Sequence, residues 1–228
     1  MILREDKLCY LVGSVCSVMA AKIDKEKAER ILSASRIPSG CKRMTFENFD
    51  YRSRELVGMG YRAAMGLANA LVEGQKPVGL YLCGDVGLGK THLGISILNR
   101  LKRAKITGGL YVTYADLLQT MRNRMDSGKR EELETLVYNA PFLVLDDLGA
   151  EHVTDWVAEQ LFRMINHRWM YRDELVTIVT SNLKPDALIR RIASKTGSSA
   201  DGQRIVSRIC EMCRLIEVQG DDYRMGRR

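Results

Sequence analysis

The sequence contains the octet Gly84-Asp85-Val86-Gly87-Leu88-Gly89-Lys90-Thr91, which matches the pattern G-x-x-x-x-G-K-[ST]. The octet follows the apolar run 78–83, which predicts a buried strand, and precedes apolar residues at helical spacing. Glycines at these positions let backbone N–H groups surround phosphate oxygens, and the N-terminus of the following helix adds positive potential. The octet therefore predicts a phosphate-binding loop that joins a strand to a helix.

The end of this loop has an expected chemistry. Lys90 would place a positive charge beside the β- and γ-phosphates of a nucleotide, and the hydroxyl of Thr91 is a suitable magnesium ligand. We therefore expect ATP and Mg²⁺ as cofactors. The expected nucleotide-binding residues are Gly84, Asp85, Val86, Gly87, Leu88, Gly89, Lys90, Thr91 and His92.

Strand and helix patterns alternate from the octet onward. Near-continuous apolar strands separated by helices are typical of a parallel sheet covered on both faces, with ligands at its carboxyl edge. The predicted fold is therefore an α/β, three-layer P-loop NTPase with a five-stranded parallel sheet. The expected strands are 78–83, 109–114, 141–146, 175–181 and 214–218, and the expected helices lie near 90–104, 115–127, 129–138, 155–171, 185–194 and 203–213.

The length of 228 residues fits one such domain and a short appendage. Residues 1–36 have a helical pattern that ends at 37–40, so we interpret 1–43 as a short helical N-terminal extension and 44–228 as the ATPase domain. The extension is either a partner-docking element or a loosely packed segment. Residues 44–50 are expected to be extended, and a helical pattern follows them.

Two further segments place polar side chains at the ends of apolar strands. The strand at 141–146 ends in Asp146 and Asp147. We expect Asp146 beside the magnesium ion and Asp147 in contact with the attacking water. The strand at 175–181 is followed by Asn182, whose amide is suited to bond the γ-phosphate or that water.

Arg204 and Arg208 lie four residues apart on one face of a predicted helix. They are either ordinary solvent-facing side chains or a finger that reaches the γ-phosphate in a neighbouring subunit.

The chain carries a formal charge of +7, which favours an anionic partner, although an enzyme can also simply be basic. Basic residues concentrate between the second and third predicted strands, and they are either a solvated face or a contact to single-stranded DNA. The candidate DNA-binding residues are Arg122, Arg124, Lys129 and Arg130.

The apolar stretch 8–20 is too short to cross a bilayer, and acidic residues precede it, which disfavours a secretory signal. We therefore expect no membrane partner and a cytoplasmic location. The six cysteines lack the spacing of a disulfide framework or a zinc site, so we expect free thiols.

Several phrases together resemble the bacterial helicase-loader ATPases of the DnaC/DnaI type, which are AAA+ proteins. The resemblance covers about residues 44–224. The more discriminating phrases are Gly89-Lys90-Thr91-His92-Leu93, Leu145-Asp146-Asp147-Leu148-Gly149 and the closing Gly220-Asp221-Asp222-Tyr223-Arg224. Thr180-Ser181-Asn182 and Thr45-Phe46-Glu47-Asn48-Phe49 are also similar to that group.

The resemblance implies that Asn182 is a sensor of the γ-phosphate and that Arg208, supported by Arg204, is a finger acting between subunits. It implies an ATP-dependent row or ring of subunits, a replicative helicase as partner, and delivery of that helicase to single-stranded DNA. The second acid is Asp147 where general AAA+ enzymes have Glu, and no lid subdomain is expected after the fifth strand, so slow turnover stimulated by DNA or a partner is expected.

Two alternatives remain at this point. The IstB-like transposition helpers share nearly all these motifs and act on double-stranded DNA with a transposase. A nucleotide-gated adaptor with little hydrolysis would also suit the shorter carboxylate of Asp147.

Overall fold

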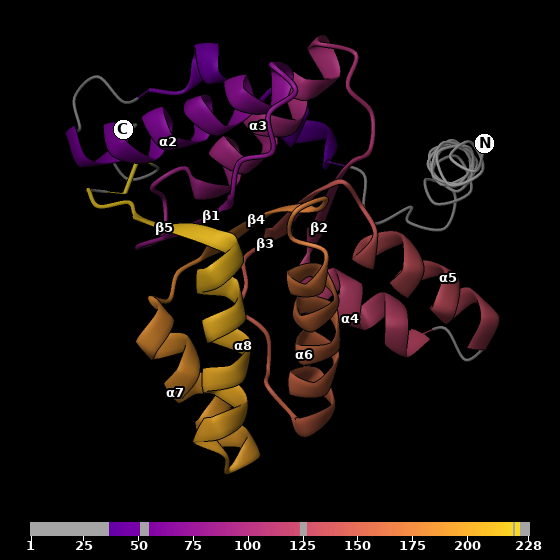
Figure 1. The fold of residues 1–228 in the computed structure, drawn as a ribbon. Coiled ribbons are helices and arrows are strands. Elements are labelled where there is room, and N and C mark those ends of the chain that lie inside the picture. The colour runs from indigo at the N-terminus through magenta and orange to yellow at the C-terminus, as the bar shows by residue number, and fades with distance from the viewer. Residues whose placement is uncertain (1–36, 51–54, 124–126, 221, 224–228) are drawn as a thin grey trace, which may run out of the picture.

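Figure 1 shows the computed structural model of the chain, in which residues 37–50, 55–123, 127–220 and 222–223 are described. The predicted helical extension at 1–36 lies outside these residues. Within the described part of the chain, no helix is long and apolar enough to cross a membrane.

The centre of the molecule is a five-stranded parallel sheet, as predicted. Its strands lie in the order β2-β3-β4-β1-β5. Each boundary is within one residue of the predicted one: β1 is Gly79–Cys83, β2 Gly109–Thr113, β3 Phe142–Asp146, β4 Val176–Ser181 and β5 Cys213–Glu217. The order puts β1, β3 and β4 side by side in the middle, so the phosphate loop, the acidic pair and Asn182 follow neighbouring strands.

Helices cover both faces of the sheet, which gives the three layers of the predicted fold. In Figure 1, α2 and α3 lie above the sheet and α6, α7 and α8 lie below it. Separate apolar clusters fill the two sides, one around α2 and α3 and one around α4 to α8. The helices are α2 Glu55–Val72, α3 Lys90–Arg103, α4 Tyr114–Asn123, α5 Ser127–Tyr138, α6 Asp155–Met170, α7 Pro185–Thr196 and α8 Ser199–Met212.

The segment 44–50 is not simply extended, and here the expectation was wrong. Residues Phe46–Asn48 form a short 3₁₀ turn, η2. The backbone N–H of Thr45 donates to Oδ1 of Asn48 at 2.9 Å, because short polar side chains offer the backbone local hydrogen bonds that compete with extended structure. The turn directs the buried rings of Phe46 and Phe49 toward α2 and α3.

A fully buried arginine, Arg168, joins α6 to the sheet. Its Nε donates to the hydroxyl of Thr177 at 2.8 Å, and Nη2 donates to the carbonyl of Val176 at 3.0 Å. Its Nη1 donates to the carbonyls of Tyr138 at 2.9 Å and Ala140 at 3.0 Å, just after α5 ends and before β3 begins. The buried charge is thus compensated by five oxygen acceptors, on β4, at the end of α5 and just before β3.

Candidate nucleotide site

The phosphate loop needs glycine at two positions for steric reasons. Gly87 has a φ of 79° and Gly89 a φ of 82°, in the left-handed region that disfavours other residues. A Cβ on Gly89 would lie 2.5 Å from the ring of Phe49, so the segment before α2 rests directly on the loop. The loop conformation therefore depends on both its own backbone and this distant ring.

Lys90 lies at the start of α3 with 7% of its surface exposed. Its Nζ donates to the carbonyls of Gly84 at 2.7 Å and Asp85 at 2.6 Å, so the ammonium group lies inside the curve of the loop. Burial lowers the pKa of Lys90, and the neighbouring carboxylates of Asp147 and Asp146 oppose that change. A buried ammonium group inside the loop is well placed to bind an anionic phosphate.

Asp146 ends β3 with 4% of its surface exposed and accepts hydrogen bonds from three hydroxyl groups. Thr91 Oγ1 lies 2.9 Å from Oδ1, and Tyr111 Oη on β2 lies 2.7 Å from Oδ2. Thr180 Oγ1 on β4 also donates to Oδ1. The carboxylate is therefore held by hydroxyl groups from helix α3 and from the strands β2 and β4, and the hydroxyl of Thr91 is one of its partners.

Asp147 follows immediately and is exposed, with a φ of 56°. Aspartate tolerates this left-handed conformation better than most residues. Its backbone N–H donates to Thr180 Oγ1 at 2.9 Å, and its Oδ1 accepts from Asn182 Nδ2 at 3.3 Å. The backbone turn thus brings the carboxylate of Asp147 to the amide of Asn182 at the open edge of the sheet.

The donor set suits magnesium. Thr91 and Asp146 offer hard oxygen atoms close together, and no group of three or more His, Cys, Asp or Glu side chains able to hold a metal occurs among the residues that the structure describes. This pair of oxygen donors suits Mg²⁺, because Mg²⁺ binds through one or two protein oxygens and keeps water and phosphate ligands. Cys41, Cys83, Cys210 and Cys213 are free thiols.

The side chain of His92, a predicted nucleotide-binding residue, contacts the η2 segment. Its Nε2 lies 2.9 Å from the carbonyl of Thr45 and 3.1 Å from Oδ1 of Asn48. The imidazole therefore ties α3 to the η2 turn. Burial lowers the pKa of His92, and the bond to the Thr45 carbonyl opposes this.

Four contributors were not predicted from the sequence as site residues: Tyr111, Thr180, Phe49 and Asp222. The side chain of Asp222 lies against the α-carbon of Gly87, and the N–H of Tyr223 donates to the Gly87 carbonyl at 3.2 Å. Residues 222 and 223, which belong to the closing motif of the helicase-loader resemblance, thus contact the phosphate loop. In the register of β3 against β4, Leu145 pairs with Val179, and this places Thr180 beside Asp146. Knowledge of that strand pairing would have identified Thr180 as a site residue.

Arg204 and Arg208 lie elsewhere, on α8 and against α6. Arg204 is exposed and Arg208 is half-buried. Each guanidinium lies over the ring of Phe162, at 5.0 Å and 5.2 Å respectively. None of their contacts within the described residues involves the phosphate loop, so a role at a γ-phosphate would require the site of another subunit.

The basic segment after β2 is only partly described. Arg122 is exposed, with its guanidinium 4.9 Å from the Trp156 ring. Arg130 lies 5.7 Å from the same ring and donates to Glu134 at 2.9 Å and Gln160 at 3.1 Å. Arg130 is thus held by its own domain, whereas Arg122 faces solvent. Arg124 and the side chain of Lys129 lie outside the described residues.

Comparison with known proteins gives consistent results. The sequence profile of the family described as IstB-like ATP binding protein matches residues 7–228. The replicative helicase loader DnaI of Bacillus subtilis is 27% identical over 208 residues, which cover 89% of this chain and 66% of the loader, so this chain spans about two thirds of that protein.

Solved structures show the same fold. A crystal structure of DnaI aligns with a TM-score of 0.62 and 28% identity, over 81% of this chain and 93% of that one. A crystal structure of the DnaC helicase loader aligns with a TM-score of 0.61 and 26% identity, over 79% and 99%.

The sheet order, the phosphate loop and the acidic strand end define a P-loop NTPase of the AAA+ type. Within that class, the chain belongs to the IstB-like ATP-binding family and is homologous to the DnaI and DnaC helicase loaders.

Proposed function

We propose that the chain is an ATP-hydrolysing loader that binds a replicative DNA helicase and places it on single-stranded DNA. The observation that carries this proposal is the site at the carboxyl edge of the sheet, where Lys90, Thr91, Asp146, Asp147 and Asn182 meet in a chain homologous to named helicase loaders.

In this proposal, each residue of the site has a defined action on ATP. The N–H groups of the loop and the ammonium of Lys90 bind the phosphates. A magnesium ion held by Thr91 and Asp146 would neutralise charge on the β- and γ-phosphates. Asp147 orients and accepts a proton from the attacking water, and Asn182 holds the carboxylate of Asp147 and contacts the γ-phosphate.

Arg208 completes the site from a neighbouring subunit. Its position on α8, without a contact to its own phosphate loop, supports an action between copies of the chain. ATP held between two subunits would then link nucleotide state to a row or ring of subunits. Arg122 would contribute a phosphate contact to single-stranded DNA along that row, because a single subunit offers too few contacts for tight binding.

The decisive experiment uses the full chain and candidate helicases. We expect co-purification with a replicative helicase in ATP, and deposition of that helicase on circular single-stranded DNA. Lys90→Ala should abolish the deposition, and Lys102→Ala, on the exposed end of the same helix, should not. Failure to bind any replicative helicase in either nucleotide state would contradict the proposal.

A second candidate is a transposition helper, which the family match favours because it is to an IstB-like profile. The same purification separates the two functions. A complex with a transposase, and activity on double-stranded DNA without helicase binding, would support the helper.

Turnover distinguishes both enzymes from a nucleotide-gated adaptor. The exposed position of Asp147 and its 3.3 Å contact to Asn182 are compatible with slow hydrolysis. Measurable ATP hydrolysis that Asp147→Asn abolishes would exclude the adaptor.

A further inference from the structure

Helices α6 and α8 contact each other along two matched faces, which we call the α6–α8 ladder. Both crossover helices lie on the same side of the parallel sheet and run in the same direction (Figure 1). The ladder residues are spaced by four and then three positions on each helix, so they share one helix face. They are Phe162, Asn166 and Trp169 on α6, and Arg204, Arg208 and Glu211 on α8.

The ladder encloses the guanidinium of Arg208. Its carbon lies 5.2 Å from the centroid of the Phe162 ring and 5.1 Å from that of the Trp169 ring. Its Nε donates to Oδ1 of Asn166 at 2.9 Å, and its Nη1 donates to the carbonyl of Arg204 at 2.9 Å. Nη2 makes no hydrogen bond in the part of the chain that the structure describes. The contacts thus fix the plane of the group and leave one nitrogen for an outside acceptor.

The ring that packs against Arg208 is itself held in place. The indole N–H of Trp169 donates to Oε2 of Glu211 at 2.7 Å, and Oε1 of Glu211 accepts from the hydroxyl of Ser207 at 3.3 Å. Arg172 lies 5.2 Å from the same ring. The orientation of Trp169 is therefore determined by a carboxylate on α8 and by cations packed on the ring.

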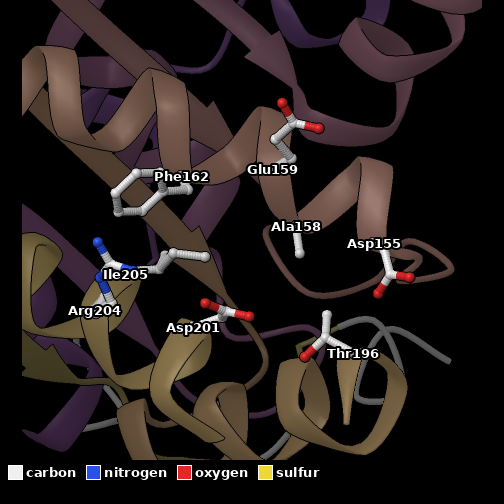
Figure 2. A pocket seen from close by; sticks show the side chains of 8 residues that line it. All are labelled: Asp155, Ala158, Glu159, Phe162, Thr196, Asp201, Arg204 and Ile205. Carbon is white, nitrogen blue, oxygen red and sulfur yellow. The ribbon is translucent and has the colours of Figure 1, made fainter. Parts of the chain in front are cut away.

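One end of the ladder borders an open recess. A cavity of about 310 Å³ lies between α6 and the α7–α8 region. Figure 2 shows Arg204 and Phe162 at one side of it, and Asp155 and Thr196 at the other. Arg204 borders this space and is exposed within the described part of the chain. The surface beside Arg208 is thus open to another protein.

We infer that Asn166 and Trp169 are positioning residues that hold Arg208 ready for the phosphate site of the next subunit. This inference rests on the proposed function, because it assumes that Arg208 acts between subunits. An arginine whose plane is already fixed loses less rotational freedom when it binds an anion, and small errors in position greatly reduce rate.

The contrast with Arg168 separates this arrangement from a purely structural one. Arg168 lies on the same helix α6, is fully buried, and directs all three of its nitrogens to oxygens of its own chain. Arg208 is half-buried, and its Nη2 has no hydrogen-bond acceptor among the described residues. Full burial requires Arg168 to place its donors on oxygens of its own chain, whereas Nη2 of Arg208 can exchange water for an outside acceptor.

The test compares Asn166→Ala and Trp169→Ala with the conservative Trp169→Phe. We measure kcat for ATP at saturating single-stranded DNA, and the Kd of a fluorescent ATP analogue. We expect kcat to fall about 10- to 100-fold in the two alanine variants, with the Kd changed by less than about two-fold. Trp169→Phe keeps a ring against Arg208 and should retain most turnover.

Mixing subunits distinguishes positioning from damage to the variant's own site. Lys90→Ala subunits are expected to bind ATP too weakly to turn it over but carry an intact ladder, so adding them should restore turnover by Asn166→Ala subunits. The matched control is Arg163→Ala on another face of α6, which removes the 3.5 Å ion pair between the exposed Arg163 and Glu134 and should leave kcat unchanged.

Parallel measurements on Arg208→Ala separate the two claims. Reduced turnover in Arg208→Ala with normal turnover in both alanine variants would overturn the inference and leave the proposed function intact. Loss of turnover that the Lys90→Ala subunits do not restore would also overturn it. If Arg208→Ala hydrolyses ATP normally, or the unmodified chain does not hydrolyse ATP, both the inference and the finger in the proposed function are wrong.

Discussion

The nucleotide edge of the sheet and the α6–α8 ladder both hold charged groups, but they do so by different means. At the nucleotide edge, the phosphate loop, the acidic pair and Asn182 follow neighbouring parallel strands and meet within one chain. In the ladder, Arg208 is oriented by aromatic and polar side chains of α6, about forty residues earlier in the sequence, as the Asn166 bond shows.

This difference shows which groups the chain itself provides in each region. The nucleotide edge contains donors, acceptors and a buried cation that all come from one chain. The ladder contains a fixed cation with a nitrogen directed to no acceptor within the described residues. We therefore expect changes at the edge to alter ATP affinity, changes in the ladder to alter turnover, and changes in the buried side of α6 to alter stability.

The largest expected effect is at the nucleotide edge. Lys90→Ala removes the buried ammonium, so the phosphates lose their charge partner, and we expect ATP affinity to fall by at least about 100-fold. Titration with a fluorescent ATP analogue measures this. ATP binding near that of the unmodified chain would break the comparison, because the edge would not be the nucleotide site.

The buried side of α6 should affect folding. Arg168→Met leaves several carbonyl oxygens and the Thr177 hydroxyl without donors, and we expect the free energy of unfolding to fall by about 3–5 kcal/mol. Urea denaturation gives this value. Arg172→Ala, in the turn just after α6, should change it by less than about 1 kcal/mol, because Arg172 is exposed. Equal effects in the two variants would contradict the distinction between the buried arginine of α6 and the exposed one after it.

A smaller effect is expected from the hydroxyls around Asp146. Thr180→Val removes both a donor to Asp146 and an acceptor for the N–H of Asp147, whereas Tyr111→Phe removes only a donor. We expect Thr180→Val to lower the free energy of unfolding by about 1–3 kcal/mol, and to require more magnesium for half-maximal ATP binding than Tyr111→Phe does. Magnesium titrations at fixed nucleotide test the order, and a larger effect of Tyr111→Phe would reverse it.

The smallest expected effect is a pH dependence at His92. Burial holds its folded-state pKa below the usual 6.5, so the unfolded chain takes up the proton first as the pH falls. The contribution of neutral, buried His92 to stability is therefore complete above about pH 6.5 and declines below it. We expect Tm to fall between about pH 7 and pH 5, and to fall less in His92→Gln.

His167 also has a pKa lowered by burial and by Arg168, so it contributes in the same direction. The double variant His92→Gln, His167→Gln separates the two contributions. An unchanged pH dependence in His92→Gln would show that the pKa of His92 does not differ between the folded and unfolded states.

Much of the fold followed from local patterns. The strand boundaries agreed within one residue because apolar runs bounded by glycine, proline or charge mark buried parallel strands well. The start of α8 was placed four residues late, since Gly197 ends α7 with a φ of 70° and a new helix begins almost at once. The η2 turn was missed because Thr45 and Asn48 hydrogen-bond locally within an otherwise extended pattern.

The sequence by itself determined the phosphate loop, the acidic strand end and Asn182, because each depends on a short contiguous segment whose conformation is set locally. Only the tertiary structure decided that Tyr111 and Thr180 hold Asp146, that Phe49 rests on Gly89, and that Asn166 and Trp169 hold Arg208. These contacts depend on strand order and on how two crossover helices lie against each other. Neither is encoded in residue spacing, since both arise from packing between segments distant in the chain.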